Sequence, residues 1–128
     1  MSFSHLRFLV ADVAAPAAFY RDVIGMRQVV DVPGIYVEFD TGGSRLAFYR
    51  ADLMGQVLGG TVGTTAGDNL VLCLRVADVD AEAARLAARG VRQVTAPHDQ
   101  AAWLQRVAHF ADPAGRVIEL WSPLAPKP

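Results

Sequence analysis

Three segments of this chain recur in the same order, 65 to 71 positions further along. The segments at 10–13, 25–29 and 44–49 resemble those at 76–79, 90–94 and 115–120. Each match is weak alone, but three in register indicate two copies of one supersecondary unit of about 60 residues. Because so short a unit buries little apolar surface by itself, the two copies are expected to pack together.

The first copy carries the pattern of a strand, a helix and three more strands. Residues 5–10 are apolar and β-prone, and the apolar side chains after Asp12 are spaced for one helical face. Asp12 is suited to cap that helix, and Gly25 is suited to end it. The remaining strands are predicted at 26–31, 35–41 and 45–50, with turns at Pro33-Gly34 and Gly42-Gly43.

The second copy repeats this pattern. Asp78 is suited to cap a helix that Gly90 ends, and residues 112–115 are typical of a turn before the last strand. Its strands are predicted at 70–76, about 91–95, 104–111 and 116–121. The segment 51–68 between the copies is rich in Gly and Thr, and we interpret it as a linker or a loop over a site.

These elements predict a single α+β domain over residues 1–128. Two βαβββ modules are expected to form a curved eight-stranded mixed sheet with a cup-shaped cleft. The first module is expected at about 1–55, the linker at 56–67, the second module at 68–122 and a tail at 123–128.

Charge and cysteine content narrow the range of partners. The 12 basic and 13 acidic residues give a net charge of −1, whereas binding to nucleic acid or an anionic membrane needs a basic face. The single cysteine excludes an intrachain disulfide, and no apolar run approaches the roughly 20 residues of a membrane helix. The first residues lack the pattern of a signal peptide. We therefore expect a cytoplasmic protein with neither nucleic acid nor membrane as partner.

Strand alternation separates the two faces of the predicted sheet. In the first strand, Phe8 and Val10 share the apolar face that the helices should cover, which leaves His5 and Arg7 on the open face. Glu119 falls on the open face of the last strand by the same reasoning. A histidine and a carboxylate directed into one cup are half of a metal site. Arg7 is the alternative partner of Glu119, because a carboxylate in a cup needs one.

Four segments carry motifs that can be compared with known families, namely 5–12, 18–26, 36–39 and 110–120. Together they resemble the vicinal oxygen chelate superfamily, which includes glyoxalase I, bleomycin-resistance proteins and extradiol dioxygenases, and the resemblance covers essentially the whole chain. It implies the two-module fold and, for a chain of this length, a homodimer. The superfamily spans lyases, transferases, oxygenases and pure binders, so the fold does not assign a reaction.

The resemblance also implies where metal ligands would stand. The first would be His5, seven residues before Asp12, and the last would be Glu119. By the internal repeat, Phe48 occupies the slot equivalent to Glu119, and Val71 the slot equivalent to His5. Neither Phe nor Val binds a metal, so no cofactor is expected and a divalent metal is the lesser alternative.

We predict that the cup binds a small, partly aromatic organic molecule without metal, as in the resistance-type branch of the superfamily. The expected pocket residues are His5, Arg7, Phe48, Val71, Trp103, Arg106, Glu119 and Trp121. Phe48 supports this prediction, because an aromatic ring offers stacking area where an enzyme would keep a carboxylate.

Two enzymatic functions stay open beside this one. A metal-dependent lyase or dioxygenase would use His5 and Glu119 with a third ligand. The candidates for that ligand are Asn69, His98 and His109. A metal-free enzyme would use His5 as a general base, oriented by Glu119 or Arg7. Outside these roles, His98 is expected in an exposed loop, and Cys73 is expected to be a small apolar filler within a strand.

Overall fold

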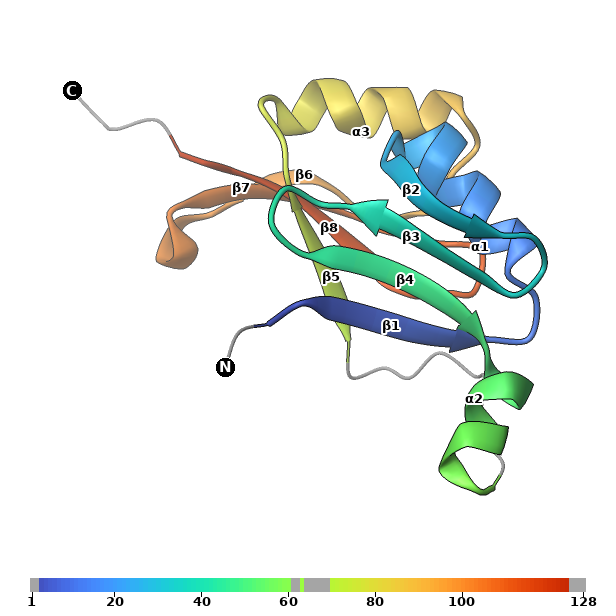
Figure 1. Ribbon diagram of the computed structural model, residues 1–128. Coiled ribbons are helices and arrows are strands. Elements are labelled where there is room, and N and C mark those ends of the chain that lie inside the picture. Colours follow the sequence, from blue (N-terminus) through green and yellow to red (C-terminus); the bar gives the residue numbers. More distant parts are fainter. Residues whose placement is uncertain (1–2, 61–62, 64–69, 125–128) are drawn as a thin grey trace. The chain divides into compact units, whose positions relative to one another are not determined.

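The computed structural model describes residues 3–60, 63 and 70–124 (Figure 1). The chain divides into two compact units, Met1–Thr65 and Ala66–Pro128. Each unit holds one four-stranded mixed sheet, and helical segments pack against one face of it. Within the described residues, no helix has the length and apolar character needed to cross a membrane.

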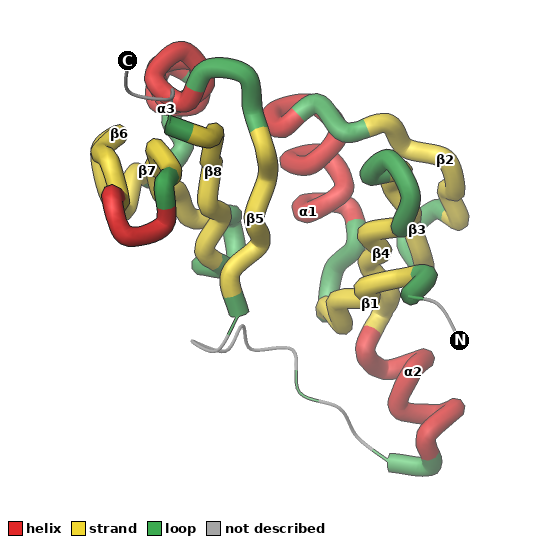
Figure 2. The backbone as a smooth tube through the Cα atoms, turned by 90° about the vertical axis from the view of Figure 1, so that its left-hand side faces the viewer, coloured by secondary structure: helices red, strands yellow, loops and turns green. Residues whose placement is uncertain are grey.

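The first unit contains four strands, the helix α1 with its π-helical continuation η1, and a second helix α2. Its elements are β1 His5–Val10, α1 Ala14–Ala18, η1 Phe19–Ile24, β2 Arg27–Val32, β3 Tyr36–Asp40, β4 Arg45–Arg50 and α2 Ala51–Leu58. The strand order is β1-β4-β3-β2 (Figure 2). β1 is parallel to β4, and the other two strand pairs are antiparallel.

The second unit repeats this topology with the helix α3 and a short 3₁₀ turn, η2. Its elements are β5 Val71–Arg75, α3 Val79–Ala88, β6 Gln93–Gln100, η2 Ala101–Trp103, β7 Gln105–Ala111 and β8 Val117–Pro123. The strand order is β5-β8-β7-β6, and β5 is parallel to β8. The shared order confirms the predicted repeat and the α+β fold of two βαβββ modules.

The strands form two sheets rather than the single eight-stranded sheet expected from the sequence. In residues 3–60 and 70–124, every strand ladder joins strands of the same unit. In each copy the first strand pairs with the fourth, so the four strands of that copy form a sheet by themselves. The first and second strands of the copy are the two edges of this sheet. The predicted cup depends on how the two units are placed, and it stays a prediction.

The predicted cap of α3 is confirmed, whereas that of α1 is not. Asp78 caps α3 by accepting a hydrogen bond from the N–H of Ala81 at 3.1 Å, whereas the N-cap of α1 is Val13, and Asp12 Oδ1, one residue earlier, accepts from the N–H of Ala14 at 3.0 Å. Gly25 and Gly90 follow the helices with φ of 88° and 77°. Glycine adopts this left-handed conformation without a steric penalty, which explains both positions.

The covered face of the first sheet is aromatic. Phe39 and Phe48 are fully buried, and Tyr20 of η1 packs on both, with ring centroids 6.5 and 5.1 Å away. Phe8 of β1 lies 5.5 Å from Phe48. The prediction that Phe48 faces the open side is therefore wrong, because its strand turns this ring into the core.

The covered face of the second sheet is more aliphatic. α3 lies along β6, β7 and β8 (Figure 1). Val79 and Leu86 of α3 are buried, as are Phe110 and Ile118 of the sheet. The apolar spacing predicted for this helix therefore matches the face that it buries.

Two segments differ from the sequence prediction. Residues 51–58, expected as part of a linker, form α2, because most of them favour a helix and Gly59 ends it with φ of 77°. β6 runs five residues further than predicted, so His98 pairs with Val107 in the sheet and does not lie in a loop. β6 is an edge strand, which accommodates Pro97.

Candidate functional site

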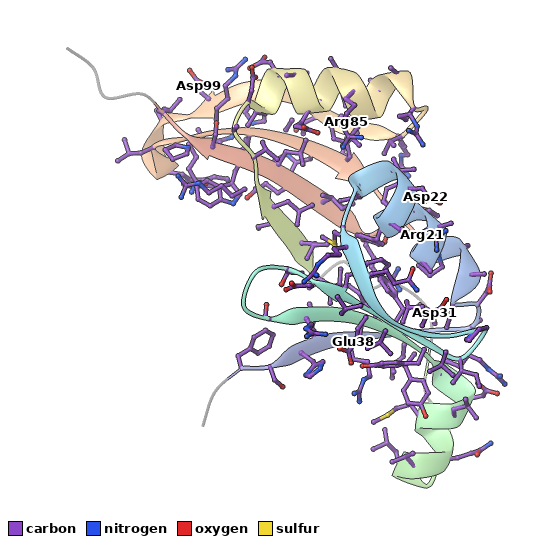
Figure 3. The ribbon with its side chains drawn as sticks, turned by 45° about the horizontal axis from the view of Figure 1, so that its top comes forward. Arg21, Asp22, Asp31, Glu38, Arg85 and Asp99 are labelled. Atoms are coloured by element: carbon purple, nitrogen blue, oxygen red, sulfur yellow. The ribbon has the colours of Figure 1, made fainter. Side chains whose placement is uncertain are left out.

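In each unit, we call the sheet face opposite the one that its own helices cover the uncovered face. The uncovered face of the first sheet carries a group of polar side chains around Glu38, which Figure 3 labels. Strand register sets two adjacent rows across β3, β4 and β1, namely Asp40, Arg45 and His5, then Glu38, Ala47 and Arg7. The four side chains in direct contact are Tyr36, Glu38, His5 and Arg45, and we call them the Glu38 cluster.

Both carboxylate oxygens of Glu38 have partners. Arg45 Nη1 donates to Oε1 at 3.2 Å, the Tyr36 hydroxyl donates to Oε2, and His5 Nε2 lies 3.3 Å from Oε2. The Glu38 side chain is 12% exposed. The hydrogen bond from Tyr36, aided by the charges of His5 and Arg45, holds the pKa of Glu38 below its ordinary value despite burial. Glu38 is therefore a fixed anion at neutral pH.

Arg7 lies over two tyrosine rings on the same face. Its guanidinium carbon is 5.5 Å from the centroid of Tyr36 and 5.8 Å from that of Tyr49. The two rings meet edge to face, with centroids 5.5 Å apart. Burial, and then the hydrogen bond to Glu38, raises the pKa of Tyr36, so its hydroxyl stays a protonated donor. The arrangement holds a cation within reach of two aromatic rings.

An open pocket of about 490 Å³ lies at the Glu38 cluster. Its lining residues are Phe3, Ser4, His5, Glu38, Asp40, Gly43, Ser44 and Arg45. All of them belong to the first unit. The pocket combines a guanidinium, an imidazole and two carboxylates with the exposed ring of Phe3, which is a suitable lining for a small molecule with a polar group.

The uncovered face of the second sheet carries a second polar group. His109 Nε2 is 2.9 Å from Glu119 Oε1, and the Cys73 thiol donates to Glu119 Oε2 at 3.4 Å. On the other side of the imidazole, His109 Nδ1 is 2.6 Å from the Thr95 hydroxyl oxygen. We call these four side chains the Glu119 cluster.

The Glu119 cluster is arranged to hold the imidazole of His109 in one orientation. A carboxylate on one nitrogen of His109 and a hydroxyl on the other fix the orientation of the imidazole. Burial, and then the contact with Glu119, raises the pKa of Cys73. The thiol therefore stays protonated as a hydrogen-bond donor and is a poor nucleophile.

Two further side chains stand beside this cluster. Arg75 lies over the ring of Trp121, with its guanidinium carbon 5.2 Å from the ring centroid. His98 Nδ1 is 2.8 Å from the carbonyl oxygen of Ala96, and His98 Nε2 is 3.0 Å from Gln100 Nε2. Because the carbonyl can only accept and the amide nitrogen can only donate, Nδ1 acts as the donor and Nε2 as the acceptor in these two contacts.

The predicted pocket residues are divided between the two uncovered faces. His5 and Arg7 lie on the first, and Val71, Glu119 and Trp121 lie on the second. Within its own unit, Glu119 contacts His109 and Cys73. The predicted pair between Arg7 and Glu119 would join the two units and stays a prediction.

Arg106 lies on the helix side of the second sheet, so its assignment to the open face is wrong. It donates to Asp80 of α3 at 2.6 and 2.8 Å and to Asp99, labelled in Figure 3, at 2.8 Å. Alternation explains this placement, because Arg106 shares its face with the buried Phe110. Trp103 is 54% exposed in η2, and its predicted contact with a ligand stays a prediction.

Sequence reasoning missed Tyr36, Glu38 and Thr95 as site residues. Alternation with the buried Val37 and Phe39 was a signal for the first two, since it leaves them on the uncovered face. Thr95 was hidden because the register of β6 shifts on both sides of it.

The donor set does not match the metal centre that the resemblance implies. By strand register, Ala47 is the first-unit counterpart of Glu119 and Val71 is the counterpart of His5, so two of four positions have no ligating atom. Among the residues that the structure describes, no group of three or more His, Cys, Asp or Glu side chains is arranged to hold a metal ion. Asn69, a predicted alternative ligand, lies outside the described residues.

Comparison with known sequences identifies relatives of the whole chain. A family model described as Glyoxalase/Bleomycin resistance protein/Dioxygenase superfamily matches residues 2–120. The uncharacterized protein YraH of Bacillus subtilis (strain 168) is 30% identical over 128 residues, which are 97% of this chain and 100% of that protein.

Solved structures share the fold over nearly the full length. A protein of unknown function from Agrobacterium tumefaciens str. C58 is 31% identical, with a TM-score of 0.81, covering 97% of this chain and 95% of that one. TnmS3, an antibiotic-binding protein from Streptomyces sp. CB03234, is 27% identical, with a TM-score of 0.73 and 96% of each chain covered. The chain belongs to the glyoxalase/bleomycin resistance protein/dioxygenase superfamily.

Proposed function

We propose that this protein binds a small, partly aromatic organic molecule without a metal ion. The observation that carries the proposal is an arrangement repeated on both uncovered faces, where an aromatic ring adjoins a carboxylate that a histidine contacts. Tyr36 adjoins Glu38 on the first face, and Trp121 adjoins Glu119 on the second. The rings offer contact area and the polar groups offer orientation. The likeness to TnmS3, an antibiotic-binding protein, supports a ligand of drug size.

Calorimetric titration of a panel of planar aromatic drugs tests the proposal. Hits are expected in the micromolar range, about −8 kcal/mol. Tyr49→Leu and Trp121→Leu each remove a ring from one uncovered face, and at least one of them should weaken each hit. Leu58→Ala, at an exposed position of α2, is the control and should change nothing. A panel without hits, or hits that neither ring variant weakens, contradicts the proposal.

The metal-independent part of the proposal has its own test. Ala47 and Val71 supply no ligating atom at two of the four positions that the family resemblance implies, so zinc and nickel should bind weakly in calorimetry. The melting temperature should not rise with metal concentration. Tight, stoichiometric binding would contradict this part. It would favour a metal-dependent lyase or dioxygenase that uses His5 and Glu119.

We also propose that the protein is a cytoplasmic homodimer, as the family resemblance implies. Light scattering on the purified chain should give twice the mass of one chain across the micromolar range. A mass equal to one chain at all concentrations would contradict the homodimer.

A further inference from the structure

The carboxylates that line the pocket of the first unit already have donors on every oxygen. Glu38 is contacted on Oε1 by Arg45 and on Oε2 by Tyr36 and His5. Asp40 Oδ1 accepts from the N–H of Gly42 at 3.0 Å, and its Oδ2 accepts from Arg27 at 2.6 Å. A cation or neutral donor entering the pocket would have to share these oxygens with donors that are already in place.

The donors on this face are in excess. A guanidinium carries five N–H groups, and Arg45, whose side chain is 40% exposed, uses Nη1 for Glu38. Within the part of the chain that the structure describes, no carboxylate forms an ion pair with Arg7, which rests on the rings of Tyr36 and Tyr49. This face therefore presents the guanidinium groups of Arg7 and Arg45 to solvent. Of the described carboxylates on the same face, Glu38 pairs with Arg45 and none pairs with Arg7.

Arg7 and Arg45 stand in adjacent rows of the same face, on the neighbouring strands β1 and β4. The rings of Tyr36 and Tyr49 restrict the side chain of Arg7. The contact with Glu38 restricts that of Arg45, so both side chains have little conformational freedom left to lose when a ligand binds. Phe3, 69% exposed at the pocket, offers a ring to the apolar part of a ligand. A bound molecule could thus place its anion on the guanidinium groups and its ring against Phe3.

We propose that this pocket binds the anionic group, carboxylate or phosphate, of an aromatic ligand, with Arg45 of the pocket lining as the main receptor and Arg7, which stands outside the lining in the adjacent row, as the second. The inference rests on the proposed function, since it assigns a charge class to the ligand of that function. Charge-assisted hydrogen bonds to a guanidinium contribute roughly 1.5–3 kcal/mol each, which is about a tenfold to hundredfold change in affinity.

Three matched probes separate charge from ring binding, namely 2-naphthoate, 2-naphthyl phosphate and the neutral 2-naphthamide. Each is titrated by calorimetry into the unaltered protein at low and high salt. Either anion should bind at least tenfold more tightly than the amide, and the preference should shrink at high salt, because the pocket is open to solvent. Comparison of the two anions decides between carboxylate and phosphate as the preferred group.

Variants assign the preference to residues. Arg45→Gln and Arg7→Gln should each reduce anion affinity at least fivefold and leave amide affinity within twofold. Arg45→Lys should retain part of the preference, because it keeps the charge and loses the planar fork. Arg89→Gln, an exposed arginine of the second unit, makes the same charge change and should have no effect. Circular dichroism and melting temperature check that each variant folds.

The outcomes distinguish the two proposals. Equal binding of amide and anions by the unaltered protein overturns the anion pocket and leaves aromatic binding standing. An anion preference that survives both Arg45→Gln and Arg7→Gln unchanged also overturns it, because another group must then receive the charge. Failure of all three probes to bind contradicts the anion pocket and the proposed function together.

Discussion

Asp112→Ala is expected to be the most destabilising single change in the β7–β8 turn. The Asp112 side chain is fully buried, and that of its partner Arg116 is 7% exposed. Oδ1 accepts the N–H of Ala114 at 2.9 Å and that of Arg116 at 2.8 Å, and Oδ2 accepts from Arg116 Nη1 at 3.1 Å. One carboxylate therefore holds the turn backbone and neutralises a buried guanidinium.

The expected loss follows from what the substitution leaves behind. Removal of one partner of a buried ion pair costs about 3–5 kcal/mol, because the other charge stays desolvated. The three lost hydrogen bonds to a charged group, at roughly 1.5–3 kcal/mol each, would sum to more, but such contributions are not additive when one turn relaxes. We therefore expect a loss of about 3–5 kcal/mol for Asp112→Ala. Asp112→Asn keeps an acceptor for the two backbone N–H groups but leaves the Arg116 charge without its counter-ion, so its loss should lie at the lower end of this range, about 3 kcal/mol.

Urea unfolding at pH 7, followed by circular dichroism, measures both variants. Glu82→Gln is the control, since Glu82 pairs with Arg85 on the exposed surface of α3, and it should change stability by at most about 0.5 kcal/mol. A loss for Asp112→Ala below about 1 kcal/mol, the value of a surface pair, would refute the reasoning. If the alanine variant does not fold, the asparagine variant supplies the measurement.

Three other outcomes follow from the two sheets. Phe48→Ala should lower stability by about 3–5 kcal/mol in urea unfolding without changing ligand affinity, because the ring is fully buried; an unchanged stability would contradict its place in the core. The pKa of Glu38 is lower in the folded chain, so its stabilisation is present above the ordinary value of 4.5 and is lost as pH falls through the folded pKa. The melting-temperature difference between the unaltered chain and Glu38→Gln should therefore shrink between pH 5 and pH 3, and a constant difference would contradict this. Glu119→Gln should cost between about 1 and 5 kcal/mol, since its side chain is 12% exposed, and a double-mutant cycle should couple it to His109. Coupling to Arg7 in place of His109 would instead support the pairing predicted from the sequence.

Local signals in the sequence predicted most secondary structure. Asp78 and Gly90 bound α3 as their chemistry requires, and alternation placed His5 and Glu119 on uncovered faces. α2 was missed because its glycines at both 55 and 59 are typical of a loop, whereas one is buried within the helix and the other ends it. A composition signal does not distinguish these uses of glycine.

The candidate site was less predictable because its contacts join strands that are distant in sequence. Arg45 meets Glu38 seven residues away across a hairpin, and His5 reaches Glu38 through the parallel pairing of β1 with β4. These pairs depend on register, which hydrophobic alternation fixes only to within a shift of two residues. Composition and motif spacing cannot supply that register.

The error at Phe48 has a definite cause in the length of one turn. Asp40 pairs with Arg45 across the first hairpin, which leaves the four residues 41–44 in its turn. Ala111 pairs with Val117 across the second, which leaves the five residues 112–116. An alignment that ignores this extra residue matches Phe48 with Glu119, whereas the strands match Ala47 with Glu119.

One additional residue in a hairpin turn moves every side chain of the following strand to the opposite face of the sheet. The longer turn is the one that the buried pair of Asp112 and Arg116 holds, with both backbone N–H contacts closing on a single carboxylate oxygen. This turn sets the register of β8, in which Ile118 and Leu120 enter the core and Glu119 faces outward to His109. Residues 110–120, which carry one of the family motifs, thus have a structural role, since they fix the register of β8. Their buried ion pair positions the Glu119 cluster without belonging to it.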